Sequence, residues 1–123
     1  KLIPLLPKEE KYGLADQVKR SSKSVGANIA EGAGRFYFMD NVRFCYMARG
    51  SLDETLNHLL TSKDLGYCHK ELYDNLRAQI EEIRRLLNGY ITWLKTKKVG
   101  LNEPGANLAV HELSADYLFD YNE

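Results

Sequence analysis

The sequence of 123 residues is poor in cysteine, proline and methionine, and it contains no long hydrophobic run. Its two cysteines, Cys45 and Cys68, lack the spacing of a metal motif, so we expect reduced thiols rather than a disulfide. No segment approaches the roughly 20 apolar residues that span a bilayer, and the start lacks the pattern of a secretory signal. The composition therefore predicts a cytoplasmic protein without a membrane partner.

The sequence also lacks a recognisable catalytic or metal-binding constellation. None of His58, His69 and His111 has a nucleophile and a carboxylate at a recognisable spacing. Arg49 and His58 are separated by eight residues, which is too far for the Arg-to-His motif of helical RNases. His58, Cys68 and His69 do not have the ligand spacing of a structural zinc site. We therefore expect no enzymatic activity, no catalytic residue, no metal and no cofactor.

The formal net charge is zero, but the charges are distributed unevenly. Residues 99–123 hold five acidic residues and no lysine or arginine, whereas residues 1–98 hold 17 basic and 12 acidic residues. This contrast predicts two parts, a basic helical-bundle domain at 1–98 and an acidic linker with a docking segment at 99–123. In one interpretation, residues 99–123 contain a short docking helix with Tyr117 and Tyr121 on one face. In the other interpretation, these residues are a frayed tail.

The stretch from residue 14 to residue 35 has the strongest signature of close helix packing. Its apolar residues recur at helical spacing, and small residues occupy neighbouring positions. Gly26 costs about 1 kcal/mol relative to alanine in a helix interior, so its presence predicts that another helix approaches closely. Gly32 and Gly34 are expected to end the helix in the left-handed conformation.

Two further helices are predicted, from about residue 40 to 65 and from about residue 70 to 97, because apolar residues recur every three or four positions. Gly66 is the expected stop between them. Pro7 and the acids that follow it predict an earlier helix start, since proline geometry and negative charge both suit the first turn of a helix.

Small and polar residues define the expected contact between the first two of these helices. Gly50 and Ser51 form a small patch that we expect to face Ser24, so a bulky side chain there would cost about 1 to 3 kcal/mol through overpacking. Glu31 is expected to be a buried polar partner of Asn28, of Arg20 or of a neighbouring helix. The residues assigned to helix packing are Ser24, Asn28, Glu31, Gly32, Gly50 and Ser51.

The segments LPKEEKYGLADQVKRSSKSVGANIAEGAGR and FCYMARGSLDE, in this order, resemble the four-helix-bundle proteins named after 23S rRNA intervening sequences. The same superfamily includes the accessory variability proteins of diversity-generating retroelements. The resemblance covers roughly residues 5–97 and implies an all-α, up-and-down four-helix bundle whose first helix is missing from this chain. It also implies a homopentameric ring. In accessory variability proteins, such a ring binds nucleic acid and a reverse transcriptase.

The basic surplus makes RNA an expected partner, because lysine and arginine side chains bind phosphates. The residues assigned to nucleic-acid binding are Lys19, Arg20, Lys23, Arg35, Arg43, Arg49, Arg84, Arg85, Lys95, Lys97 and Lys98. An aromatic run, Phe36, Tyr37 and Phe38, stands where the family usually has polar, serine-containing sequence. We expect it in an exposed loop, where it stacks on unpaired bases or contacts a partner or a second subunit, and core packing is the alternative. Tyr117 and Tyr121 are assigned to the same kind of contact.

Together, the residues and the resemblance predict a non-enzymatic RNA-binding accessory protein that acts as an oligomeric scaffold. Its expected partners are further copies of itself, RNA or another nucleic acid, and a reverse transcriptase. The alternative is a protein–protein interaction scaffold without nucleic-acid binding, in which the aromatic run and the acidic tail bind another protein. Charge alone does not choose between the two, because an acidic tail also shields a basic groove.

Overall fold

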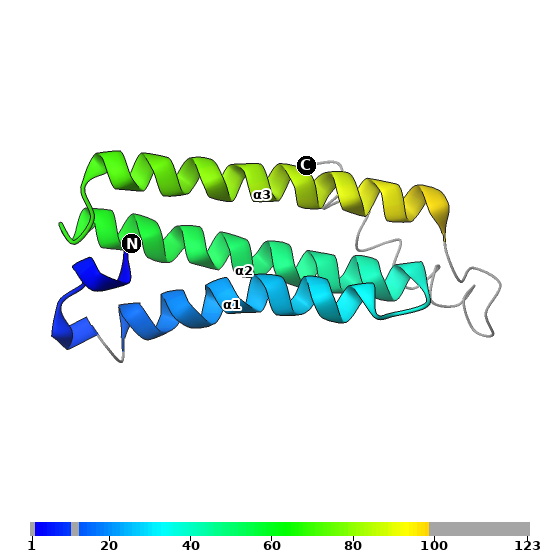
Figure 1. The fold of residues 1–123 in the computed structure, drawn as a ribbon, viewed down its shortest axis with the longest axis horizontal. Helices are drawn as coiled ribbons and strands as arrows, with labels where there is room; N and C mark the ends of the chain where they lie inside the picture. Colours follow the sequence, from blue (N-terminus) through cyan, green and yellow to red (C-terminus); the bar gives the residue numbers. More distant parts are fainter. Residues whose placement is uncertain (1, 11–12, 99–123) are drawn as a thin grey trace.

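The computed structural model describes residues 2–10 and 13–98, and three long helices make up most of them. The three lie side by side and alternate in direction along the chain (Figure 1). Their bounds are Leu14–Ala33 for α1, Phe38–Asp64 for α2 and Lys70–Lys97 for α3. The expected all-α class is confirmed, since the described residues contain no strand.

Two short 3-10 helices precede the long ones, η1 at Ile3–Leu5 and η2 at Lys8–Glu10. The helix start predicted at Pro7 is therefore a single short turn, and the first long helix begins only at Leu14. The expected fourth long helix is not among the described residues. The acidic segment from residue 99 onwards, with Tyr117 and Tyr121, also lies outside them.

The turn between α2 and α3 depends on Gly66, whose φ of 81° lies in the left-handed region that glycine adopts without strain. The N–H groups of Gly66 and Tyr67 donate hydrogen bonds of 3.0 and 2.9 Å to carbonyls in the last turn of α2. His69 then caps α3, because its Nδ1 accepts a hydrogen bond of 3.2 Å from the N–H of Leu72. The predicted stop at Gly66 and the predicted bounds of the third helix are confirmed.

The turn between α1 and α2 differs from the expectation in two ways. Gly34 has a φ of −79° and is right-handed, so the expected left-handed end of the first helix is wrong there. Helix α2 starts at Phe38, and the Phe38 side chain is only 4% exposed. The expected exposed loop therefore does not include Phe38, because this ring packs in the core.

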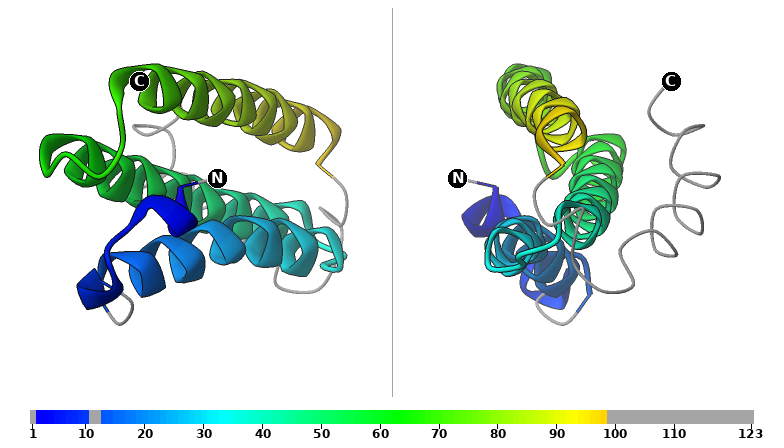
Figure 2. Two further views of the ribbon diagram at one scale, coloured as in Figure 1. Left: turned by 60° about the vertical axis from the view of Figure 1, so that its left-hand side comes forward. Right: turned by 90° about the vertical axis from the view of Figure 1, so that its right-hand side faces the viewer.

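Helix α2 is the central helix of the fold, because both α1 and α3 pack against it. The end-on view in Figure 2 shows α2 between the other two helices, with the N-terminal segment at the open side of the array. Val42, Cys45 and Ala48 are 0% exposed, and their spacing of three places them on one side of α2. Burial of such apolar surface is the main favourable term in folding.

Hydroxyl groups connect α1 to α2 along their contact. Ser51 donates a hydrogen bond of 2.9 Å to the Ser24 hydroxyl, and Thr55 donates one of 2.8 Å to Ser21. Asn28 donates to the Ser24 hydroxyl at 3.0 Å from one turn further along α1. Short side chains that are paired in this way let the two helices approach without leaving buried polar groups unsatisfied.

Helices α1 and α2 approach each other closely at Gly32. A Cβ atom at this position would lie 2.7 Å from Asn41 Oδ1 and 2.8 Å from Phe44 Cβ. Both distances are far below van der Waals contact, so only glycine fits between the helices here.

The other expected close approaches are not found among residues 2–10 and 13–98. Gly26 and Gly50 are exposed, and a Cβ atom at either position would have nothing within 4 Å. The expectation that Gly50 faces Ser24 is therefore wrong, because it is the neighbouring Ser51 that points toward α1. The expected burial of Glu31 is also wrong, since this side chain is exposed and forms an ion pair of 2.8 Å with Arg35.

We expect Gly32→Ala to lower the free energy of unfolding by about 1 to 3 kcal/mol, because the added methyl group overpacks the α1–α2 contact. Gly50→Ala is the matched control. It places the same methyl group in open space on α2 and should raise stability by about 0.5 to 1 kcal/mol through helix propensity. Urea denaturation followed by circular dichroism measures both. Equal stability of the two variants would contradict the close approach at Gly32.

Both cysteines are buried free thiols, and burial raises their pKa values. The pKa of Cys45 rises from 9.0 to about 11. Because folding raises it, the neutral thiol favours the folded state below pH 9 and loses this contribution as the pH approaches 11. We expect the thiols of the native protein to react slowly with Ellman's reagent at about pH 8, and both thiols of the unfolded chain to react rapidly. Rapid labelling of the native protein would show that the core around α2 opens readily.

Candidate nucleic-acid interface

The alternating helix directions gather basic residues at one end of the molecule. The last turn of α1, the first half of α2 and the second half of α3 all lie at this end (Figure 1). We call it the basic end and define it as residues 31–50 and 86–98. It holds six basic and two acidic residues, whereas the rest of residues 1–98 holds 11 basic and 10 acidic ones. The basic residues are Arg35, Arg43, Arg49, Lys95, Lys97 and Lys98.

The two acids of the basic end form ion pairs with nearby arginines. Glu31 forms an ion pair of 2.8 Å with Arg35, and Asp40 forms one of 2.7 Å with Arg43. The other four cations of this end come from α2 and from the end of α3.

Tyr46 contacts two of these cations, Arg49 and Lys95, at the junction of α2 and α3. The Arg49 guanidinium lies over the Tyr46 ring, 4.6 Å from its centroid, and donates a hydrogen bond of 3.0 Å to Asn88 Oδ1. Lys95 donates a hydrogen bond of 3.1 Å to the Tyr46 hydroxyl, with its Nζ 5.5 Å from the ring centroid. Cation–π contacts and hydrogen bonds restrict both cationic side chains. A phosphate that binds between them therefore costs less conformational entropy than one bound by two free side chains.

The other assigned cations lie away from the basic end, and three of them are engaged in ion pairs. Arg20 pairs with Asp16 at 3.4 Å on α1. Arg84 forms an ion pair with Asp53 that joins α3 to α2, and Arg85 pairs with Glu82 one turn earlier on α3. Lys19 and Lys23 are exposed on α1. The structure thus brings together only part of the predicted basic set.

The aromatic run divides between surface and core. Phe36 is 65% exposed beside Arg35 at the basic end. Tyr37 is half-buried, and its ring packs edge to face with Phe38 at a centroid distance of 5.1 Å. Phe36 is therefore the member of the run that is available for stacking on a base or for contact with a protein.

Sequence reasoning missed Tyr46 and Asn88, which position the cations at the α2–α3 junction. Neither residue carries a distinctive pattern, and their partners lie 39 or 49 positions away in the chain. The signal available in the sequence was the i to i+3 spacing of Tyr46 and Arg49, which places the two on neighbouring surface of a helix.

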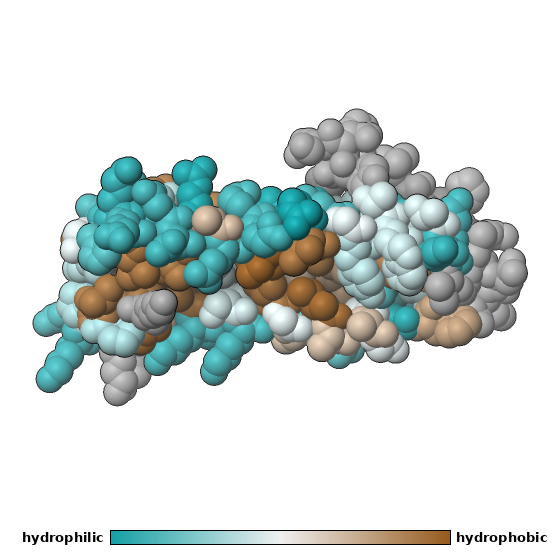
Figure 3. Space-filling view, turned by 45° about the horizontal axis from the view of Figure 1, so that its top comes forward, coloured by the Kyte–Doolittle hydropathy of each residue, from teal (hydrophilic) through white to brown (hydrophobic). Residues whose placement is uncertain are grey.

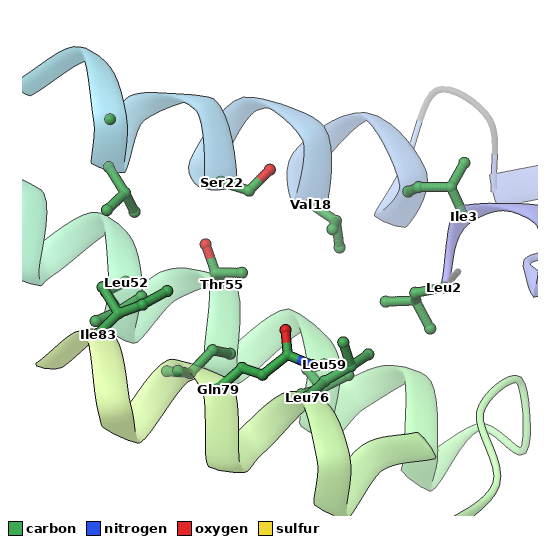
Figure 4. A pocket seen from close by; sticks show the side chains of 13 residues that line it. Leu2, Ile3, Val18, Ser22, Leu52, Thr55, Leu59, Leu76, Gln79 and Ile83 are labelled. Carbon is green, nitrogen blue, oxygen red and sulfur yellow. The ribbon is translucent and has the colours of Figure 1, made fainter.

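A second feature is an apolar groove between α1 and α3, which we call the α1–α3 groove. Figure 3 shows hydrophobic residues gathered in a band along one face of the molecule, between hydrophilic margins. Figure 4 shows side chains from all three long helices and the N-terminal segment converging on the groove. Its volume is about 370 Å³. The lining residues are Leu2, Ile3, Val18, Ser22, Val25, Gly26, Leu52, Thr55, Leu59, Leu76, Gln79, Ile80 and Ile83.

Within the described residues, no group of three or more His, Cys, Asp or Glu side chains is arranged to hold a metal ion. The candidate set of His58, Cys68 and His69 is not assembled: His69 caps α3, and His58 lies 3.4 Å from Glu54. No helix in this part of the chain combines the length and the apolar composition that crossing a bilayer requires.

These features define an all-α protein of antiparallel long helices with a basic end and an open apolar groove. The family model of the 23S rRNA-intervening sequence protein matches residues 1–89, which include α1, α2 and most of α3. The chain therefore belongs to this family, as the resemblance implied. A search of curated proteins gives no significant match.

The two arginines assigned near the middle of α3 are expected to differ in their structural effect. Arg84 is 24% exposed and bridges α3 to Asp53 on α2, so Arg84→Ala should lower the free energy of unfolding by about 1 kcal/mol. Arg85→Ala removes only a local pair on an exposed face and should leave the urea midpoint unchanged. Equal midpoints for the two variants would show that the Arg84–Asp53 bridge does not stabilise the α2–α3 contact.

Proposed function

We propose that this protein is a non-enzymatic RNA-binding accessory that acts as an oligomeric scaffold, with the basic end as its RNA-binding surface. The observation that carries this proposal is the clustering of positively charged side chains from α2 and α3 around Tyr46. The family, named for an intervening sequence of 23S rRNA, supports a role connected with RNA.

The chemistry of the basic end suits single-stranded RNA. Lysine and arginine side chains neutralise phosphates without reading the sequence, so affinity should fall steeply as salt rises. Phe36 offers an exposed ring beside these cations, and unpaired bases stack on such rings whatever their identity. Duplex RNA lacks free base faces and would use the cations alone.

The finer architecture is also part of the proposal. A fourth helix would lie in the α1–α3 groove and complete an up-and-down bundle, because this groove is the open apolar side of the array. Bundles would then assemble into a homopentameric ring, as the resemblance implies. A ring carries several basic ends at fixed separation, and multivalent binding raises affinity for one long RNA without any new contact.

If the gene belongs to a retroelement, the proposed protein partner is a reverse transcriptase. If the gene lies within a ribosomal RNA gene, the proposed RNA partner is ribosomal RNA. The competing function is a protein–protein scaffold without RNA binding. The exposed Phe36 favours it, because a large exposed aromatic side chain also suits a protein interface.

The test measures binding of a short fluorescein-labelled single-stranded RNA by fluorescence anisotropy across a salt series. We expect the double variant Arg49→Gln with Lys95→Gln to bind more weakly than the wild type. If each side chain holds one phosphate, the slope of log affinity against log salt should decrease by about 0.7 for each lost contact.

The matched control is Lys19→Gln with Lys23→Gln, which removes the same charge from α1 outside the basic end. It should leave the salt slope unchanged. Equal losses in the two double variants would place binding elsewhere or make it a general effect of net charge. Absence of RNA binding even at low salt would overturn the proposal and favour the protein–protein scaffold.

A further inference from the structure

Another groove lies between α2 and α3, and we call it the α2–α3 groove. Its volume is about 690 Å³, and it shares no lining residue with the α1–α3 groove. It is formed by the second half of α2 and the first turns of α3, so it lies away from the basic end (Figure 1). The lining residues are Asp53, Leu56, Asn57, Leu60, Lys63, Lys70, Tyr73, Asp74 and Arg77.

Both carboxylates of the α2–α3 groove form ion pairs with cations of α3. Asp53 pairs with Arg84, and Asp74 pairs with Lys70 at 3.4 Å. The groove also contains two cations that form no ion pair with a residue of 2–10 or 13–98, namely Lys63 and Arg77. An acidic ligand would therefore find cations that no other described carboxylate occupies.

Apolar surface lies beside these two cations. Arg77 is exposed, and Lys63 Nζ lies 4.5 Å from the centroid of the Tyr73 ring. Leu60 is 39% exposed, and Leu56 is partly buried against the core. A groove with these features suits a helix that combines an apolar stripe with acidic residues on its flank.

Residues 112–121 of the same chain have this combination in their sequence. Leu113, Tyr117 and Tyr121 recur every four residues, which predicts one face of a helix. An acid directly precedes each of them, so at helical spacing an acidic stripe lies about 100° around the helix from the apolar stripe. These acids are Glu112, Asp116 and Asp120.

The α1–α3 groove does not suit this segment, because no charged residue lines that groove. An acidic flank buried there would lose hydration without gaining a cation, which is costly. The α1–α3 groove is also the side on which we place a fourth helix. The α2–α3 groove offers both apolar surface and cations.

The length of chain after α3 permits docking on the same molecule. Helix α3 ends at Lys97, and Arg77 lies 20 residues earlier, about 30 Å back along the helix axis. Residues 98–107 span up to about 33 Å when extended, and residues 108–113 add about 9 Å as helix. Leu113 therefore reaches the level of Arg77.

We propose that residues 108–121 form an amphipathic helix that docks in the α2–α3 groove of their own chain. The apolar stripe covers Leu60, and the acidic stripe faces Lys63 and Arg77. The family match covers residues 1–89, so the docking segment lies outside it. The proposal depends neither on RNA binding nor on the number of copies in the assembly.

Paramagnetic broadening in NMR spectra of the full chain locates the segment. A nitroxide on Ala115→Cys points away from the apolar stripe, because residue 115 lies about 200° around the helix from Leu113. Cys45 and Cys68 are buried and should react slowly with the label. The same sample with the nitroxide reduced is the reference.

We expect the amide signals of Leu60 and Arg77 to broaden more than those of Val18, beside the α1–α3 groove, and Arg49, at the basic end. The broadening should persist when the isotope-labelled, spin-labelled chain is mixed with an excess of chain that carries neither label. Only a segment that docks on its own chain withstands this dilution.

A charge reversal in the groove tests the ionic part of the contact. Arg77→Glu should remove most of the broadening at Leu60, because it places like charge opposite the acidic stripe. Lys23→Glu is the matched control, since it makes the same change at an exposed lysine of α1 and should leave the broadening intact. Leu113→Asp should also remove the broadening, because it interrupts the apolar stripe. Circular dichroism confirms that each variant is folded.

Four outcomes would overturn the proposal. Broadening strongest at Val18 or at Arg49 would place the segment in the α1–α3 groove or on the basic end. Broadening confined to the end of α3 would show that the segment does not dock. Loss of broadening on dilution would place it on a neighbouring copy. Equal broadening in Arg77→Glu and the wild type would exclude the α2–α3 groove. None of these outcomes affects the RNA-binding test, which depends on Arg49 and Lys95.

Discussion

The burial of α2 between α1 and α3 is the constraint on which the rest of this structure depends. Val42, Cys45 and Ala48 are 0% exposed along its core side, and the flanking helices contact α2. Two helices that approach closely need small side chains at their contact. At the α1–α2 contact, Gly32 of α1 is such a residue, and Ser24 and Ser51 provide short hydroxyl side chains further along.

The same packing determines where charge accumulates. Because consecutive helices alternate in direction, the end of α1, the start of α2 and the end of α3 become neighbours. Cations that are far apart in the sequence, such as Arg49 and Lys95, then meet on either side of Tyr46. The family assignment and this cluster are the basis of the proposed RNA-binding role, and the α1–α3 groove is the site proposed for a fourth helix.

The glycines within the helices have different surroundings, which composition alone does not reveal. Gly32 is required because α2 leaves no room for a Cβ atom, whereas Gly26, Gly50 and Gly89 face open space. Gly26 lines the α1–α3 groove, whereas Gly50 and Gly89 lie on exposed surface of α2 and α3.

The sequence by itself determined the helical class, the third helix to within a residue, the turn at Gly66 and the family. These features depend on periodicity, on local backbone preference and on ordered motifs, which are all short-range. Only the tertiary structure decided that Phe38 is buried, that Glu31 is exposed and that Gly50 faces open space. Each of these features depends on which side of a helix faces its neighbour. This orientation is set when whole apolar faces pack together, so no single position in the sequence determines it.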